Sequence, residues 1–247
     1  MVKILSFDIG IKNLAYCIVE FTEDSHKILD WGILDVMEFF LQKNIKCSVV
    51  RNGKACCGDA VVSVKINDGQ QIGFCKKITC QKSANASYTS KQLKKVNIIN
   101  TKSVNILDMS SELIRKLRTK PGFLDVDIVV LENQPVLKNP TMKSIQMIIY
   151  SFFLIYGVTI EESPVKNIAL FNAGRKLDIY DGPDLNTSKD EKTYAGRKAL
   201  SIEYTRYFLK SFPEKLDFFN KNNKKDDLAD AYLQCLTYYK RNKCVII

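Results

Sequence analysis

The sequence lacks an uninterrupted apolar stretch long enough to cross a membrane. Its longest apolar segment, residues 145–160, is broken by Gln146, Ser151 and Gly157, whereas a spanning helix needs about 20 mostly apolar residues. The N-terminus also lacks the apolar core of a secretory signal, because Asp8 and Lys12 interrupt it. We therefore expect no membrane partner, and a protein that stays in the cytoplasm or nucleus.

Histidine is almost absent, and the eight cysteines include no Cys-x2-Cys pair. The one histidine, His26, follows a turn-like Glu-Asp-Ser segment and is too isolated to serve as a general base, so no Ser-His-Asp arrangement can be drawn. Without a secretory signal, the cysteines do not predict a disulfide framework. Three of them lie in apolar contexts and are expected to be inert packing residues: Cys17, Cys235 and Cys244.

The other five cysteines fall within one 34-residue stretch. Residues 46–82 also contain several glycines and alternating apolar residues, a pattern that predicts a small β-rich insertion. Two cysteine pairs separated by a β-rich spacer would resemble a zinc ribbon. The predicted ligands of a structural Zn²⁺ are Cys47, Cys56, Cys75 and Cys80, with Cys57 as the substitute for Cys56. The alternative is a set of free thiols.

Negative charge is scarce in the middle of the chain. Between residues 76 and 120, eleven lysines and arginines are opposed by Asp108 and Glu112, and the whole chain has a net charge of +10. Such a balance favours a polyanionic partner, with nucleic acid first and an anionic membrane surface second. The alternative is that the charge only keeps the protein soluble.

The apolar pattern predicts an α/β domain with a mixed sheet, formed by residues 1–40 and 100–247, and a Cys-rich insertion with a linker at residues 41–99. Strands are expected at residues 2–7, 14–21, 28–36, 126–131 and 157–161. Helices are expected at residues 103–117, 141–156, 191–210 and 225–241. Residues 83–90 have the composition of a linker, and residues 172–190 that of an exposed loop.

Acidic residues stand where two apolar strands are expected to end. Asp8 follows the first strand and Glu132 follows the strand at 126–131, where a carboxylate is costly unless a cation neutralises it. Asp227 and Asp230 are three residues apart and so share one helical face, and Asp226 could pair with Asp230 in the same way. Mg²⁺ prefers such oxygen ligands. Alternatively, the first two acids of this helix only favour its dipole.

Three motifs, in this order, resemble those of the RuvC-type Holliday junction resolvases, and above all the branch found in poxviruses and fungal mitochondria. They are FDIGIKN at residues 7–13, LENQP at residues 131–135 and KDDLAD at residues 225–230. The resemblance covers most of the chain outside about residues 40–100. It implies a ribonuclease H-like fold, a mixed sheet flanked by helices, and a homodimer that cuts four-way DNA junctions.

The resemblance also implies roles for single residues. Asp8 would bridge two Mg²⁺ or Mn²⁺ ions, and Glu132, Asp227 and Asp230 would complete the catalytic and metal-binding set, with Asp226 as an alternative metal ligand at this corner. Two such ions hydrolyse a phosphodiester by clamping the attacking and leaving oxygens. The basic residues beside these motifs would hold the DNA phosphate, or else serve only solubility: Lys12, Lys224 and Lys225.

The expected function is therefore structure-specific cleavage of branched DNA, in recombination and repair or in resolving replicated viral DNA. A viral source would add a viral replication site or the virion as its location. Two alternatives stay open: an inactive nucleic-acid-binding relative, and a nuclease that prefers RNA–DNA hybrids or flaps. The homodimer could pair through one helix face, but the favoured interpretation assigns much of that face to the core: Ser144, Met147, Ile148, Ser151, Phe152 and Ile155.

Overall fold

The computed structural model describes residues 1–66, 69–137, 139–183 and 193–246. The chain divides into two compact units. The first, which we name the sheet unit, comprises Met1–Val36 and Ile106–Ile247, and the second, the insertion unit, comprises Met37–Asn105.

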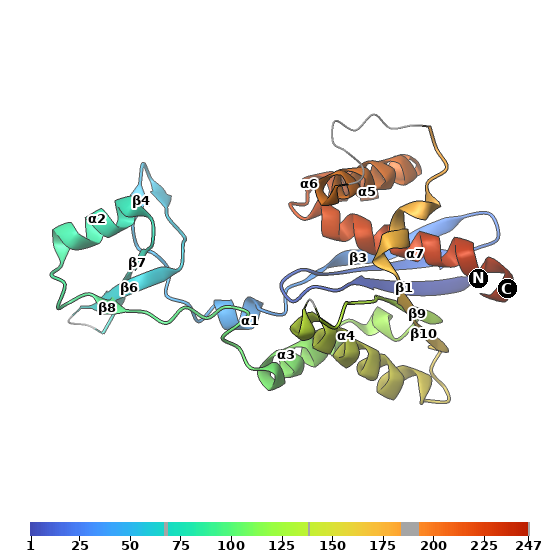
Figure 1. Ribbon diagram of the computed structural model, residues 1–247, viewed down its shortest axis with the longest axis horizontal. Helices are drawn as coiled ribbons and strands as arrows, with labels where there is room; N and C mark the ends of the chain where they lie inside the picture. The colour runs from blue at the N-terminus through green and yellow to red at the C-terminus, as the bar shows by residue number, and fades with distance from the viewer. Residues whose placement is uncertain (67–68, 138, 184–192, 247) are drawn as a thin grey trace. The chain divides into compact units, whose positions relative to one another are not determined.

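The sheet unit contains a five-stranded mixed sheet in the order β10-β9-β1-β2-β3 (Figure 1). Its strands are β1 (Val2–Asp8), β2 (Leu14–Phe21), β3 (His26–Leu34), β9 (Ile128–Glu132) and β10 (Asn167–Phe171). The first three form an antiparallel meander, and β9 and β10 run parallel to β1, so that β2 opposes the other four. This is the strand order of the ribonuclease H-like fold, and the predicted fold class is confirmed.

Helices cover both faces of this sheet, with α3 and α4 on one side and α5, α6 and α7 on the other (Figure 1). Their bounds are α3 (Ile106–Arg118), α4 (Pro140–Phe153), α5 (Tyr194–Phe208), α6 (Pro213–Lys221) and α7 (Lys225–Ile246). Shorter helical segments are η1 (Pro121–Phe123), η2 (Leu154–Val158), η3 (Ala173–Ile179) and η4 (Leu209–Ser211). The helix expected at 191–210 thus begins, within the described residues, at Tyr194.

Side chains of the central strands alternate between two cores, as the pleat of a strand requires. On β1, Ile4 packs in the cluster that contains Tyr232 of α7. The odd-numbered residue Phe7 of the same strand faces the opposite way. The centroid of its ring lies 5.3 Å from that of Phe123 and 5.8 Å from that of Phe153 on α4. Residues of β1 with even numbers therefore point toward α7.

The helix α4 continues into the π-helical η2, and together they form Pro140–Val158. This segment is long and apolar enough to cross a membrane by length and composition alone, with 33% of its most apolar window buried. Ile145, Ile149 and Phe153 are fully buried against the sheet unit, and a core helix of a soluble protein has the same composition.

The strand expected at residues 157–161 is wrong, because the chain continues as a π-helix to Val158 and then turns. Thr159 N–H donates to the carbonyl of Leu154, and Ile160 N–H to that of Gly157. A Cβ at residue 157 would lie 3.0 Å from the Cβ of Val165, so glycine allows a close approach that a larger residue would crowd. The β-branched residues that follow favour a strand locally, but these helical hydrogen bonds prevail, and the fifth strand begins at Asn167.

Among its described residues, the insertion unit contains two small sheets and two helices. Its strands are β4 (Val50–Arg51) with β5 (Lys54–Ala55), and β7 (Gln71–Cys75), β6 (Ala60–Lys65) and β8 (Lys94–Lys95) in that spatial order. Its helices are α1 (Glu38–Leu41) and α2 (Ile78–Ser87). The linker expected at 83–90 is thus wrong up to Ser87, because Ala84 is buried and continues the helix that begins at Ile78.

Two further expectations need correction. The exposed loop expected at 172–190 contains the 3-10 helix η3, whose Lys176 and Ile179 are buried; residues 184–190 lie outside the described residues. Cys17 and Cys235 are buried, as expected, but Cys244 is exposed because it lies on the solvent side of the last turns of α7.

Candidate active site

Two parallel strands bring Asp8 and Glu132 to the same edge of the sheet. Phe7 of β1 lies opposite Leu131 of β9, so the next residue of each strand is a carboxylate at the carboxyl end. By the alternation described above, both side chains point toward the α7 face. Between Asp8 and β2, a tight turn needs Gly10, because a Cβ there would lie 2.3 Å from the carbonyl oxygen of Asn13.

The helix α7 carries Asp230 to the same edge. Its stripe facing the sheet is fixed by polar contacts as well as apolar packing: Gln234 Nε2 donates to the carbonyls of Phe7 and Val130, at 3.1 Å each. The hydroxyl of Ser6 on β1 donates to the carbonyl of Ala231. Because Asp230 immediately precedes Ala231 and lies one turn before Gln234, these bonds set its distance from the strand ends.

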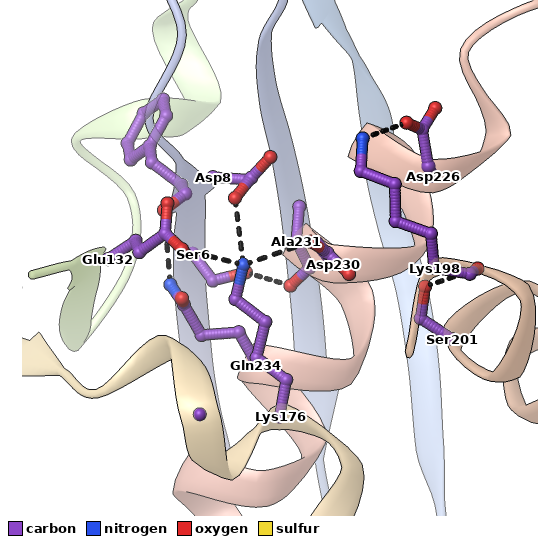
Figure 2. Close-up of polar contacts among 12 residues, drawn as sticks. Ser6, Asp8, Glu132, Lys176, Lys198, Ser201, Asp226, Asp230, Ala231 and Gln234 are labelled. Atoms are coloured by element: carbon purple, nitrogen blue, oxygen red, sulfur yellow. Dashed lines mark hydrogen bonds and ion pairs between the residues drawn. The ribbon is translucent and has the colours of Figure 1, made fainter. Parts of the chain in front are cut away.

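A buried lysine lies between the three carboxylates. The Nζ of Lys176 is 2.8 Å from Asp8 Oδ1, 3.1 Å from Glu132 Oε1 and 3.2 Å from Asp230 Oδ2. Figure 2 shows these side chains converging on the ammonium group from two strands and one helix. Lys176 is only 4% exposed, which an ammonium group tolerates only when it is paired.

Sequence reasoning missed Lys176. It follows β10, whose last residue, Phe171, pairs with Glu132, so the parallel pairing of β9 and β10 carries η3 to the acidic edge. There Thr237 of α7 donates to the carbonyl of Lys176 at 3.0 Å. The local signal is weak: Leu177 and Ile179 flank the lysine in a segment otherwise rich in polar residues, and this short apolar pattern was the one hint of a docked turn.

Burial and mutual repulsion disturb the protonation of these groups. Burial raises the pKa of Asp8 to about 7. Repulsion from Glu132 also raises this pKa, whereas attraction to Lys176 lowers it. Burial likewise raises the pKa of Asp230, which Lys176 opposes. For Lys176, burial favours the neutral amine, but Asp8, Asp230 and Glu132 together raise its pKa. Lys176 is therefore held in its protonated form, and among its carboxylate partners Asp8 has a pKa near neutrality.

The donor set fits a divalent cation. Three carboxylates already surround one positively charged group at hydrogen-bonding distance, so their oxygens converge on a single point. Carboxylate oxygens are the ligands that Mg²⁺ and Mn²⁺ prefer. Asp227 lines the same cleft as these three residues, and burial, with repulsion from Asp226 and Asp8, raises its pKa to about 6.

The neighbouring acid, Asp226, has a different partner. Its carboxylate forms an ion pair with the Nζ of Lys198 on α5 (Figure 2). Burial opposes the charge of Asp226, but the hydrogen bond from Lys198 lowers its pKa overall. The structure thus separates the two adjacent acids: one is held by a lysine, and the other opens on the cleft.

The cleft has a volume of about 380 Å³. Beside the acids, it is lined by side chains of α5 that sequence reasoning did not single out, namely Tyr194, Arg197 and Lys198. The rest of its lining comes from the ends of β1 and β9, from η3 and from α5: Ile9, Glu132, Gln134, Ala173, Gly174, Lys176, Leu177 and Ser201. Gln134 Nε2 donates to Glu132 Oε2 at 2.6 Å and so orients that carboxylate.

The lysines predicted to hold DNA lie outside the lining of this cleft. Lys12 is exposed in the turn after Asp8, and Lys224 is exposed just before α7. Lys224 nevertheless lies close enough to Asp227 to lower its pKa. Lys225 is half-buried, and its Nζ donates to the carbonyl of Asn222 at 2.6 Å.

No protein-family model matches this sequence. The chain is 27% identical, over 304 aligned positions, to the uncharacterized protein L451 of Acanthamoeba polyphaga mimivirus, with 94% of this chain and 73% of that protein covered. Among solved structures it is similar to the fowlpox virus Holliday junction resolvase (TM-score 0.48, 18% identity, 97% of this chain and 99% of that chain). It is also similar to the yeast mitochondrial Holliday junction resolvase Ydc2 (TM-score 0.46, 15% identity, 99% and 86% covered) and to Thermus thermophilus RuvC (TM-score 0.47, 10% identity, 98% and 96% covered).

Proposed function

We propose that the protein is a metal-dependent endonuclease that cuts four-way DNA junctions. One observation carries the proposal. Carboxylate oxygens of Asp8, Glu132 and Asp230 all lie within 3.2 Å of one positively charged group, the ammonium of Lys176, at the carboxyl end of a ribonuclease H-like sheet. The order and the residues of the motifs that contain these acids resemble those of RuvC-type resolvases, and this resemblance narrows the substrate to branched DNA.

Asp8, Glu132, Asp227 and Asp230 would hold two Mg²⁺ or Mn²⁺ ions. When bound, such ions activate the attacking water and stabilise the leaving 3′-oxygen. Lys176 has two uses in this scheme. Before metal binds, it balances the charge of three carboxylates, and in the cleft it is placed to donate a hydrogen bond to a phosphate oxygen.

The rest of the cleft suits a phosphodiester backbone. Arg197 and Lys198 provide cationic donors, and Tyr194, an aromatic residue, is 70% exposed. Lysine and arginine contacts to phosphates supply most of the sequence-independent affinity for DNA. Lys12 follows the strand that carries Asp8, and Lys224 and Lys225 directly precede the acids of α7, so all three would extend this contact along the strand.

We further propose that the protein acts as a homodimer, because a four-way junction has approximate two-fold symmetry and two cuts are required. The helix α4 and the segment after it present apolar side chains to solvent, including Met147 at 41% and Ile155 at 56% exposure. Of the face expected from the sequence, Phe152 is buried in the core, whereas Ser144, Met147, Ser151 and Ile155 are exposed. The exposed part would form the dimer contact.

A cleavage assay on synthetic DNA tests this proposal. With Mg²⁺ or Mn²⁺, the protein should nick a four-way junction in two symmetrically placed strands, while Asp8→Asn should bind the junction without cutting it. The same assay should include an RNA–DNA hybrid and a flap. Preferred cutting of either would favour the alternative nuclease, and binding without cutting by the unmodified protein would indicate an inactive relative.

A further inference from the structure

The insertion unit brings four cysteine thiols together around one point. The sulfurs of Cys47, Cys56, Cys75 and Cys80 all lie within 4.8 Å of one another. The Sγ of Cys56 is 3.6 Å from that of Cys75 and 3.7 Å from that of Cys80. Four sulfurs placed about 2.3 Å from a tetrahedral ion are separated by about 3.8 Å. The four thiols thus have the spacing of a mononuclear tetrathiolate site.

The four cysteines come from four different segments, and each segment is held in place by its backbone. Cys47 N–H donates to the carbonyl of Gly58, and Cys56 N–H to that of Val49. Cys75 ends β7, and Cys80 lies in the first turn of α2. Since residues far apart in the sequence meet at one centre, a metal bound there would tie the whole unit together.

The insertion unit has little else to hold it together. Its 69 residues, Met37–Asn105, contain nine buried hydrophobic residues among those described, and three of these nine are Cys47, Cys75 and Cys80. Four of the remainder are larger than cysteine: Met37, Phe40, Val64 and Phe74. A unit of this size rarely gains enough stability from such a core, and small domains commonly add a structural metal or disulfides.

We propose that Cys47, Cys56, Cys75 and Cys80 bind one structural Zn²⁺ ion, whose binding stabilises the fold of the insertion unit. All four positions are protein thiolates, as in structural rather than catalytic zinc sites. An iron–sulfur cluster fits less well, because it distributes its thiolates over several iron atoms and would need the sulfurs further apart than observed. Because ligand binding and folding are coupled in such sites, losing the ion would loosen the whole unit.

Cys57, although adjacent to Cys56, lies outside this site. It has a left-handed backbone, with φ of +54°, and its exposed thiol donates toward the carbonyl of Ala55. This turn brings Gly58 against the site: a Cβ at Gly58 would lie 3.4 Å from the Sγ of Cys75. The sequence alone left Cys56 and Cys57 as alternatives, and the structure selects Cys56.

Elemental analysis of the purified full-length chain tests the proposal. After extensive dialysis, the unmodified protein should retain about one zinc per chain, and replacement by Co²⁺ should give the intense visible absorption of a tetrahedral tetrathiolate. Cys56→Ser should lose most of the zinc and make the insertion unit sensitive to proteases. Cys57→Ser, the matched control one residue away, should keep the full zinc content.

The unmodified protein decides the question even if Cys56→Ser misfolds. The proposal would be overturned if the dialysed, unmodified protein contained no zinc and gave no cobalt spectrum. Stoichiometric iron with acid-labile sulfide would also overturn it. So would two disulfides in the chain isolated without reductant. Equal loss of zinc from the Cys56 and Cys57 variants would show that the ligand set is wrong. None of these results depends on nuclease activity.

An independent observation, the distribution of charge, carries a second inference. Residues 37–105 contain twelve lysines and arginines and three acids, a formal net charge of +9 out of +10 for the whole chain. The rest of the chain is therefore nearly neutral. Even with a Zn²⁺ ion and four thiolates, which together contribute two negative charges, the insertion unit stays strongly positive. Such a surface attracts the phosphates of nucleic acid.

The insertion unit also has a groove suited to that backbone, with a volume of about 470 Å³. Basic, amide, hydroxyl and aromatic side chains line it: Ser63, Lys65, Gln71, Tyr88, Gln92 and Lys94. We infer that this groove binds the sugar–phosphate backbone of DNA. The inference rests on the proposed function for the identity of the nucleic acid, but not for the existence of the binding surface.

Binding to a four-way junction without divalent metal, over a series of salt concentrations, tests this inference. Lys65→Gln with Lys94→Gln should weaken binding several-fold and reduce the salt slope by about 0.9 for each phosphate that the protein no longer neutralises. The control is Lys27→Gln with Lys166→Gln, the same change of charge at two exposed lysines of the sheet unit. Equal effects of the two double variants would overturn the inference. Unchanged binding by Lys65→Gln with Lys94→Gln would overturn it as well. Absence of cleavage by the unmodified protein, in a separate assay with Mg²⁺, would concern only the proposed nuclease.

Discussion

Lys176 donates a hydrogen bond of 2.8 Å to Asp8, although 168 residues separate them in the sequence. The same ammonium group lies within 3.2 Å of Glu132 and Asp230. The lysine thus supplies the positive charge that three clustered carboxylates need, at the point where their oxygens converge. A divalent ion bound by these acids would interact with the same carboxylate oxygens. Lys176 and the metal would therefore neutralise the same negative charges.

Removing the charge of Lys176 should separate its structural role from its catalytic one. In Lys176→Met, the buried carboxylates lose their partner, and we expect the metal-free protein to be destabilised by about 3–5 kcal/mol at neutral pH. Cleavage of a junction should fall by at least about 100-fold, as when a preorganised donor is removed. Thermal unfolding and single-turnover cleavage measure the two effects.

Lys176→Arg is the matched control, because it keeps the charge. It should recover most of the stability but not the full rate, since a guanidinium cannot reproduce the geometry of a compact ammonium group. Mn²⁺ affinity should not fall in Lys176→Met, because a competing cation has gone. Wild-type cleavage by Lys176→Met would contradict the role proposed for this residue.

The stability of the metal-free protein should decrease as the pH rises through neutrality. The pKa values of Asp8, about 7, and Asp227, about 6, lie above the value of 3.8 for an unperturbed carboxyl. Their contribution is therefore complete below about pH 4 and is lost as the pH rises through 6 and then 7. Mn²⁺ should raise the melting temperature more at about pH 8 than at about pH 5.

Asp8→Asn provides the check on this prediction, since it removes the group with the higher pKa of the two. The metal-free variant should be more stable than the unmodified protein at about pH 8 and differ little from it at about pH 5. Calorimetry at both pH values, with and without Mn²⁺, measures this. A stabilisation by Mn²⁺ that does not change with pH would be inconsistent with the raised pKa values.

Part of this arrangement could be predicted from the sequence, because short-range rules fix it. Strand alternation sets the direction of Asp8 and Glu132, and the three-residue spacing on a helix sets that of Asp230. Lys176 could not be predicted, because its position depends on the pairing of β10 with β9, which is a contact between distant segments. The position of β10 itself was missed for a related reason: local β-propensity at residues 158–160 was overridden by the π-helix, which ends at Val158, and by the turn that follows it.

The cysteine cluster shows the same division. Its existence follows from five cysteines in one short stretch, whereas the choice between Cys56 and Cys57 depends on a left-handed turn that no spacing rule predicts. The charge of the insertion unit is a property of composition and needs no structure. The groove beside β6 and β8 does need one, because β8 joins that sheet from beyond α2.

Phe7 should be one of the main contributors to stability, since it is fully buried and its ring packs on Phe123 and Phe153. Phe7→Ala leaves a cavity under the strand that carries Asp8 and should cost about 3–5 kcal/mol. Leu107→Ala removes a side chain that is 72% exposed, and its effect should stay within about 0.5 kcal/mol. Denaturant unfolding of both variants measures the difference, and similar values for the two would show that the core on this face is misassigned.

The proposed homodimer should depend on the exposed apolar side chains after α4. Ile155 is 56% exposed, so Ile155→Asp places a charge at the proposed contact without disturbing the core. We expect a shift from dimer to monomer in analytical ultracentrifugation, and loss of paired cuts on a junction while single nicks persist. Leu107→Asp, at an exposed apolar position on α3, should stay dimeric; an unchanged dimer in Ile155→Asp would place the contact elsewhere.

The two adjacent acids at the start of α7 should differ sharply when each is replaced by its amide. Asp227 lines the cleft, whereas Asp226 is held by Lys198, so we expect Asp227 to be the metal ligand. Asp227→Asn should reduce cleavage more than about 100-fold, since even an outer partner of a metal ligand is worth about 10–100-fold. Asp226→Asn should lose no more than about tenfold, because it acts through Lys198. Mn²⁺ titration distinguishes the two roles, since only Asp227→Asn should bind the ion more weakly. Weaker Mn²⁺ binding by Asp226→Asn alone would instead identify Asp226 as the metal ligand.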